Sequence, residues 1–217
     1  AGAMEERRQG PAELPNFGPP STPRPAASIV LLRRGGKHSQ RALEVLLLRR
    51  SEKARFMPGV WVFPGGSLDE AYGAEEAGLR ACAMRELAEE AGIELEAGEE
   101  LVPFTRWITP ELIATRFDAW FFLALAPAHT PPQPDGVETT EARWFQPAAA
   151  LEAQEAGELV LSFPTVTQLG WLAEFGTSDE AMAAYRERTV EPILPKVIAD
   201  DGPEPRVVLP GDPDYPA

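Results

Sequence analysis

Two kinds of hydrophobic pattern alternate along the chain, and together they predict a mixed sheet with helices. Short apolar runs bounded by turn residues predict β-strands, whereas apolar residues three and four positions apart predict helices. The predicted strands are 27–32, 44–48, 61–63, 101–108, 116–125 and 141–145, and the predicted helices are 75–91, 148–156, 164–175 and 179–188. We therefore expect an α+β domain with strands before and after one central helix.

The central helix, 75–91, has the clearest signature. Met84, Leu87, Ala88 and Ala91 fall on one side at helical spacing, and Gly92 provides a stop. The hydrophobic pattern therefore predicts a helix that buries one face and ends at Gly92.

The two ends of the chain differ from its centre. Residues 1–3 resemble the remnant of an expression tag ahead of Met4, and 4–24 are rich in Pro, Gly and charge without an apolar period. We expect a flexible arm over 1–25, a principal domain over 26–147, and a helical extension over 148–217 that packs on the same domain. Within that extension, the Pro-rich end, 201–217, is expected to be irregular, as is the polar loop 33–41.

Composition limits the partners of this 217-residue chain. Its net charge of -14 argues against nucleic acid or an anionic membrane surface as partners, since both attract basic proteins. The longest apolar stretch, 119–126, is much shorter than the roughly 20 residues of a membrane helix. Cys82 is the only cysteine, so no intramolecular disulfide is possible, and we expect a partly buried, inert thiol in a cytoplasmic protein.

The candidate chemistry lies on the central helix. Glu86, Glu89 and Glu90 are three and four residues apart, so they share one side of the helix. Their mutual repulsion favours a compensating cation, and an all-oxygen set suits magnesium, which can assist hydrolysis of a phosphoanhydride. Arg85 is placed to pair with Glu89 one turn on and to orient it. The alternative is a solvated, glutamate-rich helix face.

Two segments together resemble the signature of the Nudix hydrolase family. Phe63-Pro64-Gly65-Gly66 precedes the helix, and Arg85-Glu86-Leu87-Ala88-Glu89-Glu90-Ala91-Gly92-Ile93 matches the second half of the pattern G-x5-E-x7-R-E-U-x-E-E-x-G-U, with U aliphatic. The first half departs from it, because Tyr72 stands where the first glutamate is expected and an insertion precedes the helix. The replacement carboxylate is left open among four residues: Asp69, Glu70, Glu75 and Glu76.

The resemblance implies a fold and a function. It implies an α/β/α sandwich with a mixed sheet, and hydrolysis of a nucleoside diphosphate linked to another group, with magnesium or manganese as cofactor. Glu86, Glu89 and Glu90 match the family's metal ligands, and the backbone carbonyl of Gly65 matches a further one. A small-molecule nucleotide is the implied partner, and a homodimer is a family expectation.

A second resemblance concerns the substrate. Leu46-Leu47-Leu48-Arg49-Arg50-Ser51, followed by Arg55, Gly59 and Phe63-Pro64-Gly65-Gly66, is similar to the pattern of coenzyme A diphosphatases, apart from Leu48 in place of a threonine. Two of these basic residues, Arg50 and Arg55, are suited to gripping phosphates. The segment around Trp107, Arg116 and Phe117 also looks like the longer, peroxisomal-type coenzyme A hydrolases. Its aromatic residues could stack on adenine, but core packing is the alternative.

Glu138 and Glu141 lie in an acidic loop before the last predicted strand, where several Nudix enzymes carry a general base. We favour Glu138 for that role over Glu141, with a solvated loop as the alternative. Coenzyme A or an acyl derivative is the favoured substrate. The rival hypotheses are a broader hydrolase of ADP-ribose, NADH or diadenosine polyphosphates, and a non-catalytic metabolite sensor with the same fold.

Overall fold

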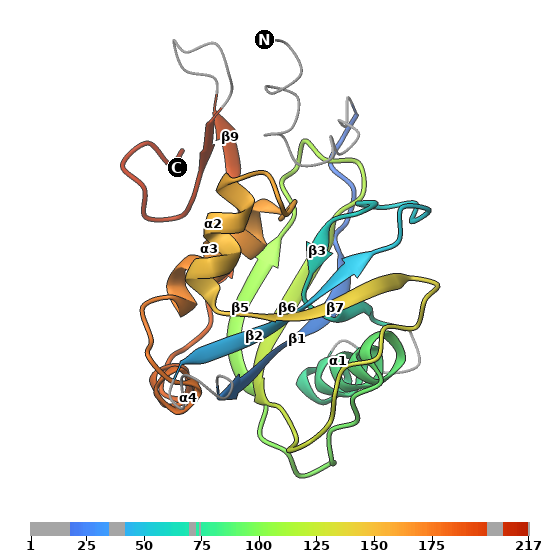
Figure 1. Ribbon diagram of the computed structural model, residues 1–217. Coiled ribbons are helices and arrows are strands. Elements are labelled where there is room, and N and C mark those ends of the chain that lie inside the picture. Colours follow the sequence, from blue (N-terminus) through green and yellow to red (C-terminus); the bar gives the residue numbers. More distant parts are fainter. Residues whose placement is uncertain (1–17, 35–41, 70–72, 74, 199–205, 217) are drawn as a thin grey trace.

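The protein is built on a mixed β-sheet in the computed structural model, which describes residues 18–34, 42–69, 73, 75–198 and 206–216. The strands are β1 (Arg24–Arg34), β2 (Leu43–Arg50), β3 (Trp61–Val62), β4 (Gly65–Ser67), β5 (Val102–Ile108), β6 (Phe117–Leu125), β7 (Thr139–Phe145), β8 (Pro192–Ile193), β9 (Lys196–Ile198) and β10 (Arg206–Val208). The helices are α1 (Glu76–Ala91), α2 (Pro147–Glu155), α3 (Phe163–Leu172) and α4 (Ser178–Arg186). The main sheet has the order β3-β2-β1-β6-β5-β8, with β4 paired to β1 and β7 to β2 (Figure 1).

Strand β1 is the organising strand of this sheet. It runs parallel to β6 and antiparallel to both β2 and β4. Its residues from Ala27 to Leu32, apart from the half-buried Ser28, are fully buried, as expected for a strand covered on both faces. The sheet is therefore mixed, as the sequence predicts.

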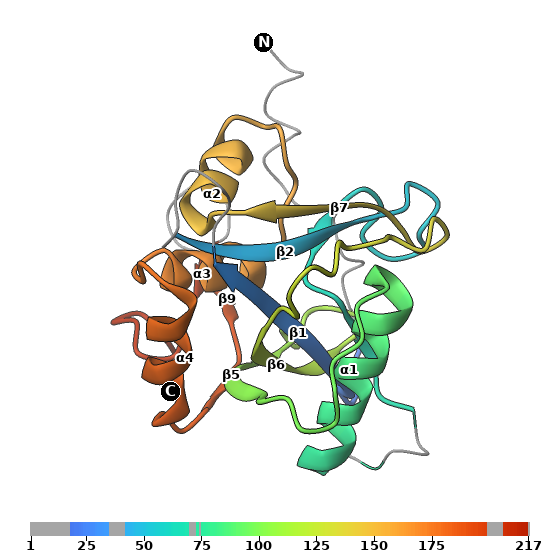
Figure 2. The same ribbon diagram turned by 60° about the horizontal axis from the view of Figure 1, so that its bottom comes forward.

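The two faces of the sheet are covered by different helices. Ile29 and Leu31 of β1 pack in the cluster with α1, whereas Val30 and Leu32 pack in the cluster that includes residues of α2, α3 and α4. This alternation follows from the period of two along a strand. Figure 2 shows α1 on one side of the sheet and the other three helices on the opposite side. The expected α+β class and α/β/α sandwich are confirmed.

Helix α1 buries the face that packs on the sheet. Leu79, Cys82 and Leu87 lie in the core, and Gly92 ends the helix in the left-handed region with φ 64°. The backbone N–H of Gly92 donates to the carbonyl of Ala88, one of the last carbonyls of the helix. The predictions of this helix and of its end are confirmed, and Cys82, expected to be partly buried, is fully buried.

The structure differs from the predictions in several regions. Arg24 and Pro25, at the end of the predicted arm, begin β1, and the predicted helical extension also contains the strands β8 and β9. Gly65–Ser67 lies outside the predicted strands but forms β4, because it pairs with β1 across Ala26–Ser28. The prediction of an irregular segment over 201–217 is wrong for Arg206–Val208, which forms β10 and pairs with β9. Most of the predicted arm and of the loop 33–41 lies outside the described residues, although Arg33 and Arg34 extend β1. Among the described residues, no helix is long and apolar enough to cross a membrane.

Candidate active site

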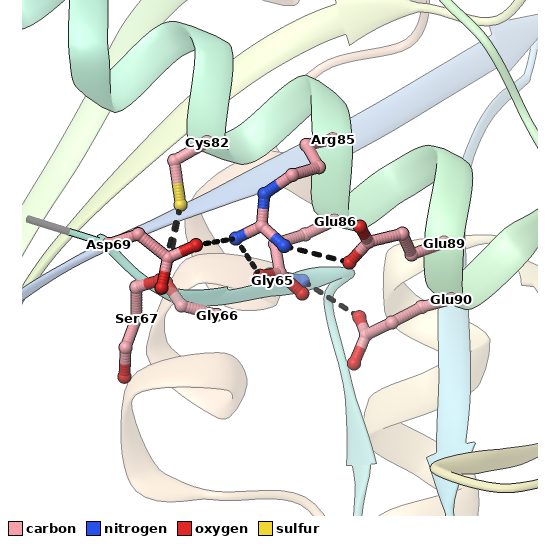
Figure 3. Close-up of polar contacts among 9 residues, drawn as sticks. All are labelled: Gly65, Gly66, Ser67, Asp69, Cys82, Arg85, Glu86, Glu89 and Glu90. Atoms are coloured by element: carbon pink, nitrogen blue, oxygen red, sulfur yellow. Dashed lines mark hydrogen bonds and ion pairs between the residues drawn. The ribbon is translucent and has the colours of Figure 1, made fainter. Parts of the chain in front are cut away.

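The glycines of β4 bring the backbone of this short strand against α1. Gly65 lies opposite Ser28 of β1, and its backbone N–H donates to Oε2 of Glu90 at 3.0 Å. A Cβ at Gly66 would lie 2.6 Å from the carboxyl carbon of Glu86. A side chain at Gly66 would displace the Glu86 side chain, whereas a side chain at Gly65 would meet Ser28 and Ala27 of β1. Figure 3 shows Gly65 beside Glu90.

Arg85 is the hub of the ion pairs on this side of α1 (Figure 3). Its Nη1 lies 2.8 Å from Glu89 Oε2, and its Nη2 lies 2.7 Å from Glu86 Oε1 and 3.6 Å from Asp69 Oδ2. Burial lowers the pKa of Arg85, but the charges of Glu86 and Glu89 outweigh it and the net shift is upward. The pair between Arg85 and Glu89 that their spacing predicts is present.

The four carboxylates considered for the first box position fall in different places. Asp69 lies on the segment after β4 and reaches the ion-pair cluster of α1. Glu75 precedes the helix as its N-cap residue, and Glu76 pairs with Arg80 one turn further on. Glu70 lies outside the described residues, as does Tyr72. Among the described candidates, Asp69 is therefore the one joined to the helix cluster.

Glu90 is the most deeply buried of the helix carboxylates. It is 3% exposed, and desolvation raises its pKa to about 7. The N–H of Gly65 and the charge of Arg50 lower that pKa, while the charges of Glu86 and Glu138 raise it further. Glu90 is thus a buried carboxylate close to other carboxylates. A nearby cation would offset the repulsion among their charges.

The pKa of Glu86 is shifted by burial and neighbouring charges in the same way. Burial raises its pKa, the charge of Arg85 opposes this, and the charges of Glu89 and Glu138 raise it again. Glu138 is exposed on the loop before β7, yet it acts on both Glu86 and Glu90. The fold therefore brings the loop glutamate and the helix glutamates together.

A group of oxygen ligands with excess negative charge suits a hard divalent cation. The groups that could hold one are Glu86, Glu90, Glu89 and the carbonyl of Gly65. Within the described part of the chain, no three His, Cys, Asp or Glu side chains already stand in an arrangement that could hold an ion. The side chain of Glu89 is 57% exposed and pairs with Arg85.

The basic segment after β2 borders the same carboxylates. Nε of Arg50 donates to the carbonyl of Phe56 at 2.9 Å, and the backbone N–H of Ser51 donates to the carbonyl of Glu138 at 2.8 Å. Arg55 is exposed in the same loop. The structure therefore joins the segment with Arg50, Ser51 and Arg55 to the loop with Glu138.

The three remaining predicted substrate residues are placed differently. Trp107 is 4% exposed and stacks on Trp171 of α3, with ring centroids 6.1 Å apart, on the face of the sheet opposite α1. Arg116 is buried, and its guanidinium donates to backbone carbonyls of two neighbouring segments. Aromatic packing therefore occupies Trp107, and hydrogen bonds to the backbone occupy Arg116. Phe117 is half-buried, with its ring edge against Phe56.

Two residues beside the site, Asp135 and Thr139, are not among those predicted from the sequence. Asp135 accepts hydrogen bonds from three consecutive backbone N–H groups, and Thr139 is completely buried. The pair Asp135-Gly136 is a turn signal that could have drawn attention to this segment.

Comparison with known proteins identifies the family. The chain belongs to the NUDIX domain family, whose model matches residues 22–163. It is an enzyme of the Nudix hydrolase class, which acts on nucleoside diphosphate derivatives and generally uses a divalent metal ion.

Two curated relatives align with most of the chain. A protein of Caenorhabditis elegans that bears the name nudix hydrolase 7 is 27% identical over 213 residues, which covers 82% of this chain and 70% of that protein. The acyl-coenzyme A diphosphatase NUDT19 of Xenopus laevis is 24% identical over 277 residues, covering 80% and 71%.

Solved structures share the fold. A NUDIX hydrolase from Alicyclobacillus acidocaldarius has a TM-score of 0.67 and 25% identity, and the match covers 75% of this chain and 96% of that one. The NUDIX domain of Shewanella oneidensis NrtR, complexed with ADP ribose, has a TM-score of 0.50 and 20% identity, covering 71% and 88%. The second likeness bears on the fold alone.

Proposed function

We propose that this protein is a magnesium-dependent hydrolase that cleaves the diphosphate bond of coenzyme A or an acyl-coenzyme A. The observation that carries the metal part of the proposal is the buried carboxylate of Glu90, held by the N–H of Gly65 and surrounded by the charges of Glu86 and Glu138. Two observations favour the substrate. One is the upstream pattern with Arg50, Ser51 and Arg55, and the other is the likeness to the acyl-coenzyme A diphosphatase of Xenopus laevis.

In this proposal Glu86, Glu89 and Glu90 hold the magnesium ion together with the carbonyl of Gly65. A bound divalent cation would polarise a phosphoryl oxygen and lower the pKa of a coordinated water. Arg85 holds the carboxylates of Glu86 and Glu89 near each other, through the ion pairs at 2.7 and 2.8 Å.

Side chains of this protein accept the proton and bind the phosphates. Glu138 accepts the proton of the attacking water, since an exposed loop carboxylate beside buried ones can reach solvent and substrate. Arg50 and Arg55 bind the phosphates, because a chain with a net charge of -14 needs local cations to hold a polyanion. Arg50 already lies near enough to Glu90 to lower its pKa.

A substrate panel with magnesium titration tests this function. We expect coenzyme A to be cleaved to 4′-phosphopantetheine and adenosine 3′,5′-bisphosphate, identified by mass, and turnover to cease when EDTA removes the metal. ADP-ribose, NADH and diadenosine tetraphosphate form the comparison set. Hydrolysis of a comparison compound without hydrolysis of coenzyme A or its acyl derivatives would remove the substrate assignment but keep the metal-dependent chemistry. Turnover of coenzyme A that is unaffected by EDTA would overturn the metal assignment.

Gly66→Ala is expected to lower kcat by about 10²-fold while changing the melting temperature little. The added Cβ would meet the carboxylate of Glu86 at 2.6 Å, and this flexible side chain can move aside. Its displacement removes a proposed ligand from position, and a misplacement of about 1 Å can cost about 10²-fold in rate. The measurements are steady-state kinetics and thermal unfolding, with Gly98→Ala as the control because nothing lies within 4 Å of a Cβ there. Unchanged kcat in Gly66→Ala would contradict the role of Glu86.

A further inference from the structure

The segment 135–139, which carries Glu138, forms a turn whose backbone is held by the side chain of Asp135. Oδ1 of Asp135 accepts from the backbone N–H groups of Val137, Glu138 and Thr139 at 2.9, 3.0 and 2.9 Å. The backbone N–H of Gly136 donates to the carbonyl of Thr139 at 2.8 Å. Partial burial raises the pKa of Asp135, but these backbone donors outweigh it and the net shift is downward. The turn is therefore held by a charged acceptor across its whole length.

The same turn is fastened to the end of α1. Oγ1 of Thr139 donates to the carbonyl of Glu90 at 2.8 Å, and the backbone N–H of Gln133 donates to the carbonyl of Ala91 at 2.7 Å. These carbonyls belong to the last turn of the helix, where no helical N–H groups follow that could donate hydrogen bonds to them. Thr139 is fully buried, and its hydroxyl lies between the carbonyl of Glu90 and, at 3.3 Å, Oδ1 of Asp135. Hydrogen bonds at both ends of this loop thus attach it to the helix that carries the acidic residues.

A third attachment reaches the basic segment. The carbonyl of Glu138 accepts from the N–H of Ser51, which follows Arg50 directly. The backbone of Glu138 is therefore held between α1 on one side and the loop after β2 on the other. Its side chain is left exposed at the place where its charge acts on Glu86 and Glu90.

We propose that Asp135 and Thr139 are positioning residues that hold Glu138 at the reaction site, Asp135 by shaping the turn and Thr139 by fixing it to the backbone of Glu90. Neither side chain takes part in the chemistry itself. The inference rests on the proposed function, because it gives Glu138 the role of proton acceptor. It adds two residues that the Nudix pattern discussed above does not contain.

A double-mutant cycle tests this proposal with coenzyme A as substrate, or with ADP-ribose if that is cleaved faster. Thr139→Val keeps the shape and removes the donor, and Asp135→Ala removes the acceptor. Each is expected to lower kcat by about 10-fold with less than a twofold change in KM, because proton transfer depends on placement more than substrate binding does. Thr139→Ser restores the hydroxyl and is expected to recover at least half of the wild-type kcat. Thr140→Val is the matched control on the adjacent, exposed residue.

The cycle is completed by the same substitutions in a Glu138→Gln background. If the two residues act through Glu138, they lower kcat no further there, since coupled residues are not additive. An equal loss in both backgrounds, or no loss in either, would overturn the positioning role. Glu138→Gln alone tests the proton acceptor separately, with an expected loss of about 10²-fold. Wild-type kcat in that single variant would remove both roles, whereas a loss in Glu138→Gln with additive effects of Thr139→Val would remove only the positioning role.

Discussion

Replacing Glu90 by glutamine is expected to lower kcat by about 10³-fold, which corresponds to about 4 kcal/mol of transition-state stabilisation. Glutamine keeps the volume of the side chain and an oxygen that can accept from the N–H of Gly65, but it removes the charge that a cation needs. Steady-state kinetics with magnesium titration measure the loss. Glu94→Gln is the control, because Glu94 is exposed just beyond the end of α1. Equal activity of the two variants would remove Glu90 from the metal site.

The stability of the same variant distinguishes loss of function from loss of fold. The pKa of Glu90 is raised from 4.5 to about 7 by burial, so the folded protein binds its proton more tightly than the unfolded chain does. The contribution of Glu90 to stability therefore falls as pH rises from about 4.5 to about 7. Metal-free Glu90→Gln should accordingly unfold at a higher temperature than the wild type at pH 8. A lower melting temperature would instead indicate a structural role for the charged form.

Gly65→Ala is expected to destabilise the protein by about 3 kcal/mol, at the upper end of the usual cost of overpacking. The added Cβ would lie 2.0 Å from the hydroxyl and 2.6 Å from the Cβ of Ser28, and 2.7 Å from the carbonyl of Ala27. Rotation of the serine side chain cannot relieve a clash with its own Cβ or with the backbone of β1. Strand β4 must therefore move away from β1, which weakens the pairing that brings Gly65 to Glu90.

Thermal or urea unfolding measures this effect, and a melting temperature lower by about 6–12 °C corresponds to the expected loss. Gly98→Ala provides the control for a glycine with open space around it. A Gly65→Ala protein as stable as that control would show that β4 can separate from β1 without cost, and would contradict the close approach described above.

Local sequence rules determined most of the framework. The apolar run over 27–32 predicted a strand, and in the structure it forms the buried part of β1. The spacing of Leu87 and Ala91 and the stop at Gly92 predicted α1, since a helical face and its left-handed cap are set by neighbouring residues. The spacing of Arg85 and Glu89 predicted their pair for the same reason. These features depend on residues at most a few positions apart.

Only the tertiary structure decided which of these groups meet and in what environment. Glu89 and Glu90 are adjacent and chemically identical, yet Glu90 is buried against Gly65, 25 residues earlier, while Glu89 faces solvent and Arg85. The attachment of Thr139 to Glu90 spans 49 residues, and β4 exists only because β1 lies beside it. The sequence left stacking on adenine and core packing open for Trp107, and the fold places it against Trp171 of α3. Burial, desolvation and long-range pairing arise from packing between distant segments, so the sequence determined the acid groups and the fold determined their surroundings.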